Sequence, residues 1–361
     1  MRRMAGMRTL AALPLFLAGC GDNAHHDPDG GSRDAIAGAE CLPAANCTTD
    51  CWCVDPQVGT AALLLGVWGS SPTSVWAVGE NGTILHWDGA AWSLQRSGTS
   101  AMLSGIHGTG DSDVWAVGGA FDATGVNATT LHWNGSSWSN VPISARVHLQ
   151  RVWAIAPDDV WAVGDLAGDG SVPNFQQMVQ HWDGTQWTVA PGNPNGESVP
   201  MFHGVWASSA NDVYVAGGFR SLTGFTFVTR WDGTKWTGSR SVDSDIVFGI
   251  HGTGPNDIWA GSSGGYPHGF DSWVLHFTGA VASPDAQLLR NHQLSQLWVA
   301  DSMHIFFVGQ YGHIVRGDGT TWTALASGTD TNLWGVWASA ANDVWAVGED
   351  GLVLHRAPQR R

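Results

Sequence analysis

The sequence predicts an all-β fold, a seven-bladed β-propeller whose blades are four-stranded antiparallel sheets. One observation behind this is a phrase close to Asp-Val-Trp-Ala-Val-Gly that recurs about every 39 to 53 residues. Another is composition: Gly numbers 48 and Trp 22, while only 13% of the residues are charged. A repeat that cannot bury its own apolar face must stack on its neighbours, so the copies predict one cooperative architecture.

Each copy of the phrase is centred on one aromatic anchor. The anchors are Trp76, Trp115, Trp161, Tyr214, Trp259, Phe306 and Trp345. In the first copy we expect strands at 64–68, 75–78, 83–87 and 92–95, because these segments are apolar and rich in Val, Ile and Trp. Turn residues separate them, for example Asp88-Gly89. Four short antiparallel strands per repeat form one propeller blade.

Most tryptophans occupy equivalent positions of the repeat. The first-strand position holds Trp68, His107, Trp153, Trp206, His251, Trp298 and Trp337. Fourth-strand positions hold Trp92, Trp138, Trp187, Trp236 and Trp322. We expect these side chains to form the core between blades. Only Trp273 and Trp334 stand outside the pattern.

The last copy ends after its third strand, at 352–356, and the missing strand is found at the front of the chain. The segment that begins Trp52-Cys53-Val54 reads like the one that begins Trp322-Thr323-Ala324. We therefore expect the N-terminal segment to supply the outer strand of the seventh blade, which removes two free sheet edges. The propeller body is predicted to span 50–357.

The N-terminus carries an export signal. Arginines precede the apolar stretch 10–18, which ends in Leu17-Ala18-Gly19-Cys20, so residues 1–19 are predicted to be a signal peptide. Leu-Ala-Gly-Cys resembles a bacterial lipobox, which implies that Cys20 is lipidated and that 20–40 is a flexible tether. Gly21 after the lipid cysteine favours the outer membrane of the cell envelope, on either its periplasmic or its surface side. The alternative is an ordinary signal with a chance cysteine.

Four cysteines fall within residues 41–53, namely Cys41, Cys47, Cys51 and Cys53. In an exported protein such a set predicts two disulfides, and three connectivities are open. Direct pairing of Cys51 with Cys53 is disfavoured by geometry. A four-thiolate zinc site is the alternative. We expect this cluster to lie beside the seam of the ring.

The charge pattern excludes one class of partner. The net charge is -15 at pH 7, whereas nucleic-acid binding needs a basic face. Two polar rows repeat around the ring: Asp113, Asp159, Asp212, Asp257 and Asp343, and His86, His132, His181, Arg230, His276, Arg316 and His355. We expect structural roles for both, because metal ligands must converge on one ion. No cofactor or metal is expected, and the chain is expected to be monomeric.

The phrase Val-Trp-Ala-Val-Gly with Asp-Gly-x-x-Trp resembles the BNR-like and photosystem II assembly factor-like propellers and the tectonin repeats of secreted lectins. The resemblance covers roughly 50–357 and implies the fold more than the function, because propellers carry unrelated activities. It departs from sialidases, since Asp88-Gly89-Ala90-Ala91-Trp92 lacks the spacer of their Asp-box and the chain has few Glu residues.

Function is expected on one face of the disc, where the second-to-third strand links and the links between blades vary. The long ones are 118–129, 165–177, 217–227, 261–273, 190–202 and 282–296. The ligand-binding candidates are Phe121, Phe175, Phe219, Arg220, Phe225, Phe227, Tyr266, His268, Phe270, Trp273, Tyr311 and His313. These predict a non-enzymatic binding module for a glycan or an envelope protein. The alternatives are a glycan-active hydrolase or lyase with its site near the central channel, and a structural role in envelope assembly.

Overall fold

The computed structural model divides the chain into two units, Met1–Glu40 and Cys41–Arg361. The residues that the structure describes all belong to the second unit. They are 47–48, 50–55, 58–122, 125–165, 178–191, 201–219, 225–240, 245–264, 271–278, 282–290 and 292–357. The predicted signal peptide, the tether, Cys20 and Cys41 lie outside them.

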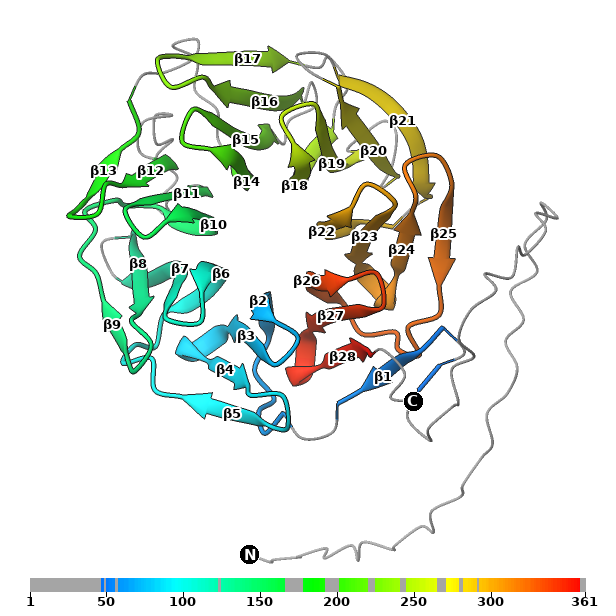
Figure 1. Ribbon diagram of the computed structural model, residues 1–361, viewed down its shortest axis with the longest axis horizontal. Coiled ribbons are helices and arrows are strands. Elements are labelled where there is room, and N and C mark those ends of the chain that lie inside the picture. The colour runs from blue at the N-terminus through cyan, green and yellow to red at the C-terminus, as the bar shows by residue number, and fades with distance from the viewer. Residues whose placement is uncertain are drawn as a thin grey trace, which may run out of the picture. The chain divides into compact units, whose positions relative to one another are not determined.

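The second unit is a seven-bladed β-propeller, as predicted, with four antiparallel strands in each blade (Figure 1). Blade 1 contains β2 (Leu64–Ser71), β3 (Ser74–Gly79), β4 (Ile84–Trp87) and β5 (Trp92–Gln95). Blade 2 contains β6 (Met102–Gly110), β7 (Asp113–Asp122), β8 (Gly125–Trp133) and β9 (Trp138–Asn140). Blade 3 contains β10 (His148–Ala156), β11 (Asp159–Asp165), β12 (Val179–Trp182) and β13 (Trp187–Val189).

The remaining blades repeat this order. Blade 4 contains β14 (Phe202–Ser209), β15 (Asp212–Phe219), β16 (Phe225–Trp231) and β17 (Trp236–Arg240). Blade 5 contains β18 (Asp245–Gly254), β19 (Asp257–Gly264), β20 (Ser272–Phe277) and β21 (Ala282–Leu289). Blade 6 contains β22 (Leu294–Asp301), β23 (His304–Gly309), β24 (Ile314–Gly317) and β25 (Trp322–Leu325). The first strand of each blade faces the axis of the ring (Figure 1).

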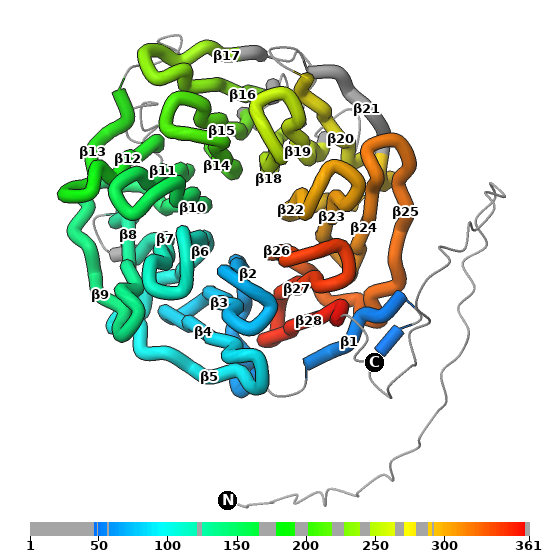
Figure 2. The backbone as a smooth tube through the Cα atoms, viewed as in Figure 1, coloured from blue at the N-terminus to red at the C-terminus, as the bar shows by residue number. Residues whose placement is uncertain are grey.

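Blade 7 is built from both ends of the chain. It contains β26 (Leu333–Ala340), β27 (Asp343–Gly348) and β28 (Val353–Arg356), and its outer strand is β1 (Trp52–Val54). β1 pairs antiparallel with β28, with Trp52 opposite Arg356 and Val54 opposite Leu354. In Figure 2 the blue start of the described chain lies beside its red end. The predicted ring closure is therefore present.

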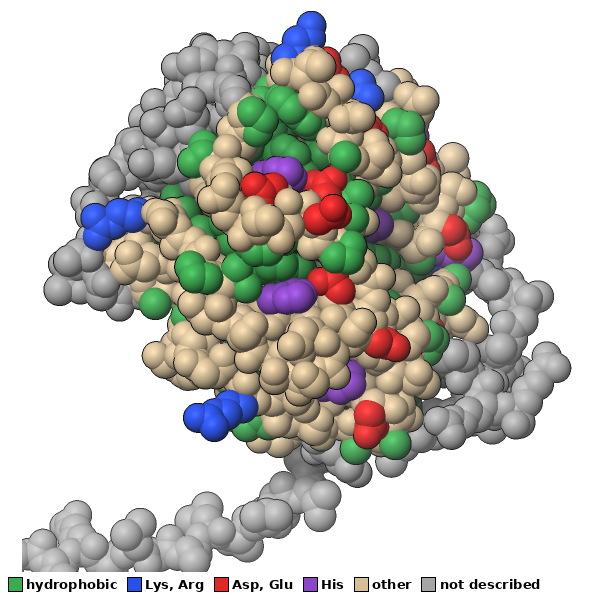
Figure 3. All heavy atoms as spheres, turned by 60° about the vertical axis from the view of Figure 1, so that its left-hand side comes forward, with side chains coloured by type: hydrophobic (Ala, Val, Ile, Leu, Met, Phe, Trp, Pro, Cys, Tyr) green, Lys and Arg blue, Asp and Glu red, His purple; other side chains and the backbone are tan. Residues whose placement is uncertain are grey.

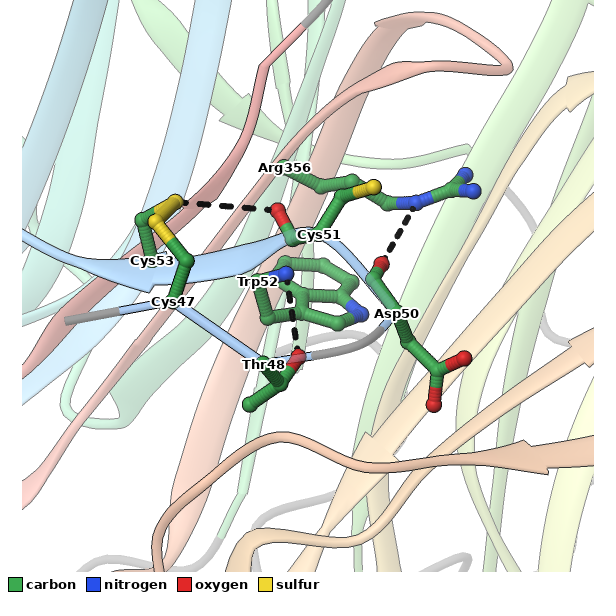
Figure 4. The surroundings of a disulfide bond; sticks show 7 residues. All are labelled: Cys47, Thr48, Asp50, Cys51, Trp52, Cys53 and Arg356. Carbon is green, nitrogen blue, oxygen red and sulfur yellow. Dashed lines mark hydrogen bonds between the residues drawn. A yellow bond between two sulfur atoms is a disulfide. The ribbon is translucent and has the colours of Figure 1, made fainter. Parts of the chain in front are cut away.

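A disulfide between Cys47 and Cys53 lies at this seam, and Cys53 itself belongs to β1 (Figure 4). Asp50 next to it connects two blades, because its backbone oxygen accepts a hydrogen bond from Arg356 Nε (3.1 Å) and its side chain accepts one from the Ala326 amide (2.7 Å). Cys51 is also disulfide-bonded, with a partner outside the described residues. The disulfide prediction is supported by these bonds, which leave no thiolates at Cys47, Cys51 and Cys53 for the zinc alternative.

The tryptophans fill the space between blades. The second-strand anchor of one blade packs edge-on against the fourth-strand Trp of the next, as in Trp76 with Trp138, whose ring centroids are 5.4 Å apart, and Trp345 with Trp92, also 5.4 Å. Edge-to-face packing of this kind adds to the stability that burial provides. The last anchor, Trp345, joins blade 7 to blade 1, so the same contact is present between the last blade and the first.

Two of the links expected from the sequence are regular structure. Much of 118–129 continues the β7–β8 hairpin, with Phe121 opposite Val126 and Asp122 opposite Gly125. The link expected at 282–296 instead begins with β21, the outer strand of blade 5. That strand lacks the Trp that marks the other outer strands, which is why the repeat pattern did not reveal it.

Besides strands, the described part of the chain includes three 3-10 turns: η1 (Glu80–Gly82), η2 (Gln310–Gly312) and η3 (Glu349–Gly351). Within this part of the chain no helix has the length and apolar character needed to cross a membrane.

Candidate functional site

The predicted ligand-binding residues that the structure describes lie on several different blades. Phe175, Arg220, Tyr266, His268 and Phe270 lie outside the described residues. Backbone positions place Phe121 on β7, Phe219 on β15 and Phe225 on β16, where Phe219 pairs with Phe225 across the hairpin. These three therefore belong to strand ends and not to irregular loops.

Two further candidates also lie on strands. Phe227 on β16 is 3% exposed and packs edge-on against Phe202, with 6.2 Å between ring centroids, so its side chain belongs to the core between blades 3 and 4. Trp273 is half-buried on β20, opposite Ser262 of β19.

Tyr311 and His313 do lie together at the surface. Tyr311 is 59% exposed, and its ring and that of His313 both contact His292, at 5.5 Å and 4.5 Å between centroids. Burial, together with the nearby His292, lowers the pKa of His313. Tyr311 has a φ of 53°, in the left-handed region, where the equivalent turns place Asn81 and Asp350. Asn and Asp tolerate this conformation better than Tyr does, so the fold holds an exposed aromatic side chain at some cost in strain.

A cavity of about 420 Å³ lies at the centre of the propeller, and we call it the cup. Each inner strand contributes a side chain at the same position of the repeat, and together these form the cup row: Leu65, Ser104, Gln150, His203, Phe248, Ser295 and Trp334. The other lining residues are Met102, His148, Arg151, Asp165, Gln293, Leu294 and Gln310. Gln293 comes from a link between blades and Gln310 from a second-to-third strand link, so the cup lies on the variable face.

The inner strands place the cup row by a short local pattern. A buried apolar residue comes first, such as Leu64 or Phe202, both 0% exposed, and the next side chain then faces the cup. A glycine follows in five blades, at Gly66, Gly105, Gly204, Gly249 and Gly335. Neighbouring inner strands approach closely here, since a Cβ at Gly105 would lie 2.9 Å from Arg151 Cα. Glycine thus permits the narrow ring around the cup.

Arg151 and Gln296 replace this glycine in the other two blades, and their side chains meet across the ring. Arg151 Nε donates to Gln296 Oε1 at 3.2 Å, which joins blade 3 to blade 6. Arg151 Nη1 donates to the backbone oxygens of Ser104 (3.0 Å) and Gln150 (2.8 Å). Its partners are all neutral oxygens, and no carboxylate among the described residues lies within 4.0 Å of the guanidinium.

The electrostatic surroundings of Arg151 follow from burial. Burial lowers the pKa of Arg151 to about 10, so the guanidinium stays charged at pH 7. Burial, with the charge of Arg151 adding to it, lowers the pKa of His148 to about 4 and that of His203 to about 4. Both imidazoles are therefore neutral at pH 7. Burial raises the pKa of Asp165 to about 6, although the hydrogen bond from Gln150 Nε2 (2.9 Å) opposes this shift.

An aromatic plug lies three residues further along each inner strand. It consists of Trp68, His107, Trp153, Trp206, His251, Trp298 and Trp337. Its rings touch around the axis, as His107 and Trp153 do at 4.0 Å between centroids, and across it, as Trp153 and Trp298 do at 6.2 Å. This row was expected between the blades, but it fills the axial channel below the cup.

Burial lowers the pKa of two plug histidines, His107 and His251, to about 3 each, and the nearby His107 adds to the shift of His251. Both are therefore neutral at pH 7. The ring nitrogens of His251 have no hydrogen-bond partner in the part of the chain that the structure describes.

The repeated Asp and His rows pair with each other. In each of four blades a third-strand His bonds a second-strand carboxylate; His132 and Asp113 are 2.7 Å apart, His355 and Asp343 2.7 Å. In blade 4, Arg230 Nε donates to Asp212 at 2.5 Å. In four of these five blades a hydroxyl four residues earlier also donates to the carboxylate, as Thr109 does to Asp113 at 2.5 Å. In Figure 3 histidine side chains (purple) lie next to carboxylates (red), while Lys and Arg (blue) are sparse on this side.

This arrangement supports the structural role that the sequence predicted for both rows. The carboxylate stands in the middle and accepts from both neighbours, whereas a nucleophilic triad needs the imidazole between hydroxyl and carboxylate. Burial raises the pKa of Asp113, but the hydrogen bonds from His132 and Thr109 outweigh it and the pKa is lowered. Among the described residues no cluster of His, Cys, Asp and Glu could hold a metal ion.

The residues of the cup row were not predicted from the sequence. The predicted site rested on variation in the links, whereas the cup row varies within strands whose neighbouring residues repeat. A signal was present, because aligned positions run Leu, Ser, Gln, His, Phe, Ser, Trp before a glycine that Arg151 and Gln296 replace. Trp334, which stood outside the tryptophan pattern, proves to be a cup residue.

Comparison with known proteins identifies the fold. No protein-family model matches the chain, and no curated protein sequence matches it. Among solved structures, YCF48 bound to a D1 peptide is 15% identical with a TM-score of 0.63, covering 86% of this chain and 97% of that one. YCF48 from Cyanidioschyzon merolae is 16% identical with a TM-score of 0.61, covering 86% and 100%.

The WD40 β-propeller domain of Doa1 is 10% identical with a TM-score of 0.62, covering 84% of this chain and 95% of that one. The resemblance to photosystem II assembly factor-like propellers is confirmed at the level of fold. The chain has a β-propeller fold similar to those of YCF48 and the WD40 domain of Doa1.

Proposed function

We propose that this chain is a non-enzymatic binding module of the bacterial cell envelope, lipid-anchored through Cys20, which holds a protein segment in the cup. The observation that carries the proposal is the cup itself: a cavity of about 420 Å³ at the centre of a rigid ring, lined from all seven blades. A volume of this size is in the range of ligand pockets. A site on a closed ring is preorganised, so little ordering of the protein opposes binding.

The lining suits a peptide. Gln150, Gln293 and Gln310 present side-chain amides, which both donate and accept hydrogen bonds as a peptide main chain requires. Phe248 and Trp334 add apolar surface for side chains, and the buried indole nitrogen of Trp334 has no hydrogen-bond partner among the described residues. YCF48, similar in fold, has been solved with a D1 peptide, which supports a peptide as the class of ligand.

The lining does not favour the hydrolase alternative. Glycoside hydrolysis by the usual mechanism needs a pair of carboxyl groups across the scissile bond. Asp165 is the one carboxylate among the lining residues described, and it accepts a hydrogen bond from Gln150. Binding alone is therefore the better account of this cavity.

The test is selection of peptide ligands on the purified full chain, followed by measurement of their affinity for three variants. Phe248→Ala and Trp334→Ala remove apolar lining from the cup, and each should weaken binding at least tenfold. Met303→Ala is the matched control, because Met303 is 54% exposed in the turn that joins the first two strands of blade 6, away from the variable face. Selected peptides that bind all three variants equally, or saturable binding of a glycan and no peptide, would refute the proposal.

Anchoring is tested separately. Cys20→Ala should abolish incorporation of labelled fatty acid and release the protein from the membrane fraction. Retention of the variant in the membrane pellet would show that Cys20 is not the anchor.

A further inference from the structure

The chain places a permanent positive charge where five of the seven blades have glycine. Arg151 occupies that position in blade 3 and lines the cup. Its side chain spans the ring to Gln296 of blade 6, which occupies the same position and is the only other exception to glycine. Arg151 and Gln296 thus depart from glycine at the same repeat position and contact each other across the axis. Packing of the repeat does not require this pair, because five blades do without it.

Within the described part of the chain, no carboxylate lies within 4.0 Å of the guanidinium in this site. Three hydrogen bonds from Nε and Nη1 go to uncharged oxygens of Gln296, Ser104 and Gln150, and Nη2 has no partner among the described residues. Removing an arginine from water without pairing it costs free energy. That cost falls when an anion binds, and planar guanidinium and carboxylate groups match in two parallel hydrogen bonds.

The neighbouring groups leave the positive charge available. His148 and His203 are neutral at pH 7 and add no competing charge, while Ser104 Oγ and His148 Nε2 are hydrogen-bonded at 2.7 Å. Asp165, the one carboxylate among the lining residues that the structure describes, accepts a hydrogen bond from Gln150 and forms no ion pair with Arg151 within 4.0 Å. Gln296, the partner that contacts Nε, is neutral, so a carboxylate is a stronger acceptor in its place.

We propose that Arg151 is the receptor for a carboxylate group of the peptide that occupies the cup, which binds the guanidinium by displacing or flanking the amide of Gln296. This inference rests on the proposed function and adds the chemical class of the group recognised. Phe248 and Trp334 line the same cavity, so the carboxylate belongs beside an apolar or aromatic side chain. Its source is either the C-terminus of a peptide or an acidic side chain within one.

The experiment uses three small probes and the full chain at pH 7. N-acetylphenylalanine carries a terminal carboxylate, N-acetylphenylalaninamide is its uncharged match, and N-acetylglutamate α-amide carries a side-chain carboxylate. Binding is measured by NMR titration of the arginine Nε–H resonances. We expect at least one acid to bind about tenfold more tightly than the amide, as a buried charge-assisted pair allows. The better acid identifies the source.

Variants identify the receptor. Arg151→Gln should remove the preference for acid over amide, and Arg96→Gln, at an exposed position on the outside of blade 1, should keep it. Gln296→Glu provides a second test that does not depend on losing Arg151, because it places a carboxylate against the guanidinium. It should abolish binding of the acids without loss of folding.

Equal affinity for acid and amide, with both weakened by Trp334→Ala, would leave the peptide-binding cup standing and overturn the role of Arg151. An acid preference that survives both Arg151→Gln and Gln296→Glu would also overturn it. Failure of all three probes, combined with binding of glucuronate, would overturn the peptide as the source of the carboxylate. Selected peptides that bind Phe248→Ala and Trp334→Ala with unchanged affinity would instead refute the proposed function itself.

Discussion

Replacing Trp52 with alanine is expected to destabilise the ring strongly. Trp52 is 0% exposed on β1 and packs in one cluster with Phe306 and Leu354. An aromatic side chain of this kind buries about 150 to 250 Å², which at roughly 25 cal/mol per Å² amounts to about 4 to 6 kcal/mol. Measured Trp→Ala and Phe→Ala changes in cores cost about 3 to 5 kcal/mol.

The expected loss is therefore about 3 to 5 kcal/mol in the free energy of unfolding, measured by urea denaturation of the full chain. In a thermal melt each kcal/mol corresponds to about 2 °C for a body of this size, so the midpoint should fall by about 6 to 10 °C. Trp322→Ala is the matched control, because Trp322 begins the outer strand of blade 6 and is only half-buried.

The control should cost distinctly less than Trp52→Ala. A loss below 1 kcal/mol for Trp52→Ala would show that β1 does not hold the seam closed, and so would a loss no larger than that of the control.

Three further changes test other parts of the molecule. Asp113→Ala leaves His132 and Thr109 without their shared acceptor and should cost about 1 to 3 kcal/mol in urea denaturation; Ser93→Ala, exposed on β5, should cost little. The pKa of His251 is lowered to about 3, so the unfolded chain takes up this proton first and stability falls as pH drops from about 6.5 to 3. His251→Phe should flatten that fall in denaturation curves at several pH values, and an unchanged slope would contradict the assignment. Cys53→Ser removes the disulfide to Cys47, which closes a loop with a sequence separation of 6, and the lost constraint on the unfolded chain should cost about 2 kcal/mol of stability. Equal melting temperatures for the variant and the parent would show that the seam does not need this bond.

The fold could be predicted because the same sequence pattern recurs in every blade. Seven copies of one phrase fix the strand order of a blade, and the shortened last copy with its match at Trp52 fixes the closure. The link lengths were harder to predict. The β7–β8 hairpin extends to Asp122, beyond the repeated phrase, and no tryptophan in this extension indicates that it is a strand.

The cup could not be predicted for a different reason. Its members are separated by whole repeats along the chain and meet only when the ring closes, so no local spacing brings Arg151 to Gln296. The aromatic candidates Tyr311 and His313 were identified from their place in a link on the variable face, and in the structure both rings contact His292, which no pattern singled out.

The strand exchange at the seam has a consequence for how the chain matures. Asp50 and Arg356 are in contact although they are 306 positions apart, so the first propeller strand to be synthesised must await the last. Closing so long a loop costs little more than closing a loop half its length, because the entropy grows only with the logarithm of length. Until β1 pairs with β28, the outer edge of β28 has unpaired backbone groups, and the β1 strand of a second copy could pair with them. At low protein concentration β28 pairs with β1 of its own chain, whereas high concentration favours pairing with β1 of another chain. The yield of refolded monomer should therefore depend on protein concentration, even though each ring is closed by a single chain.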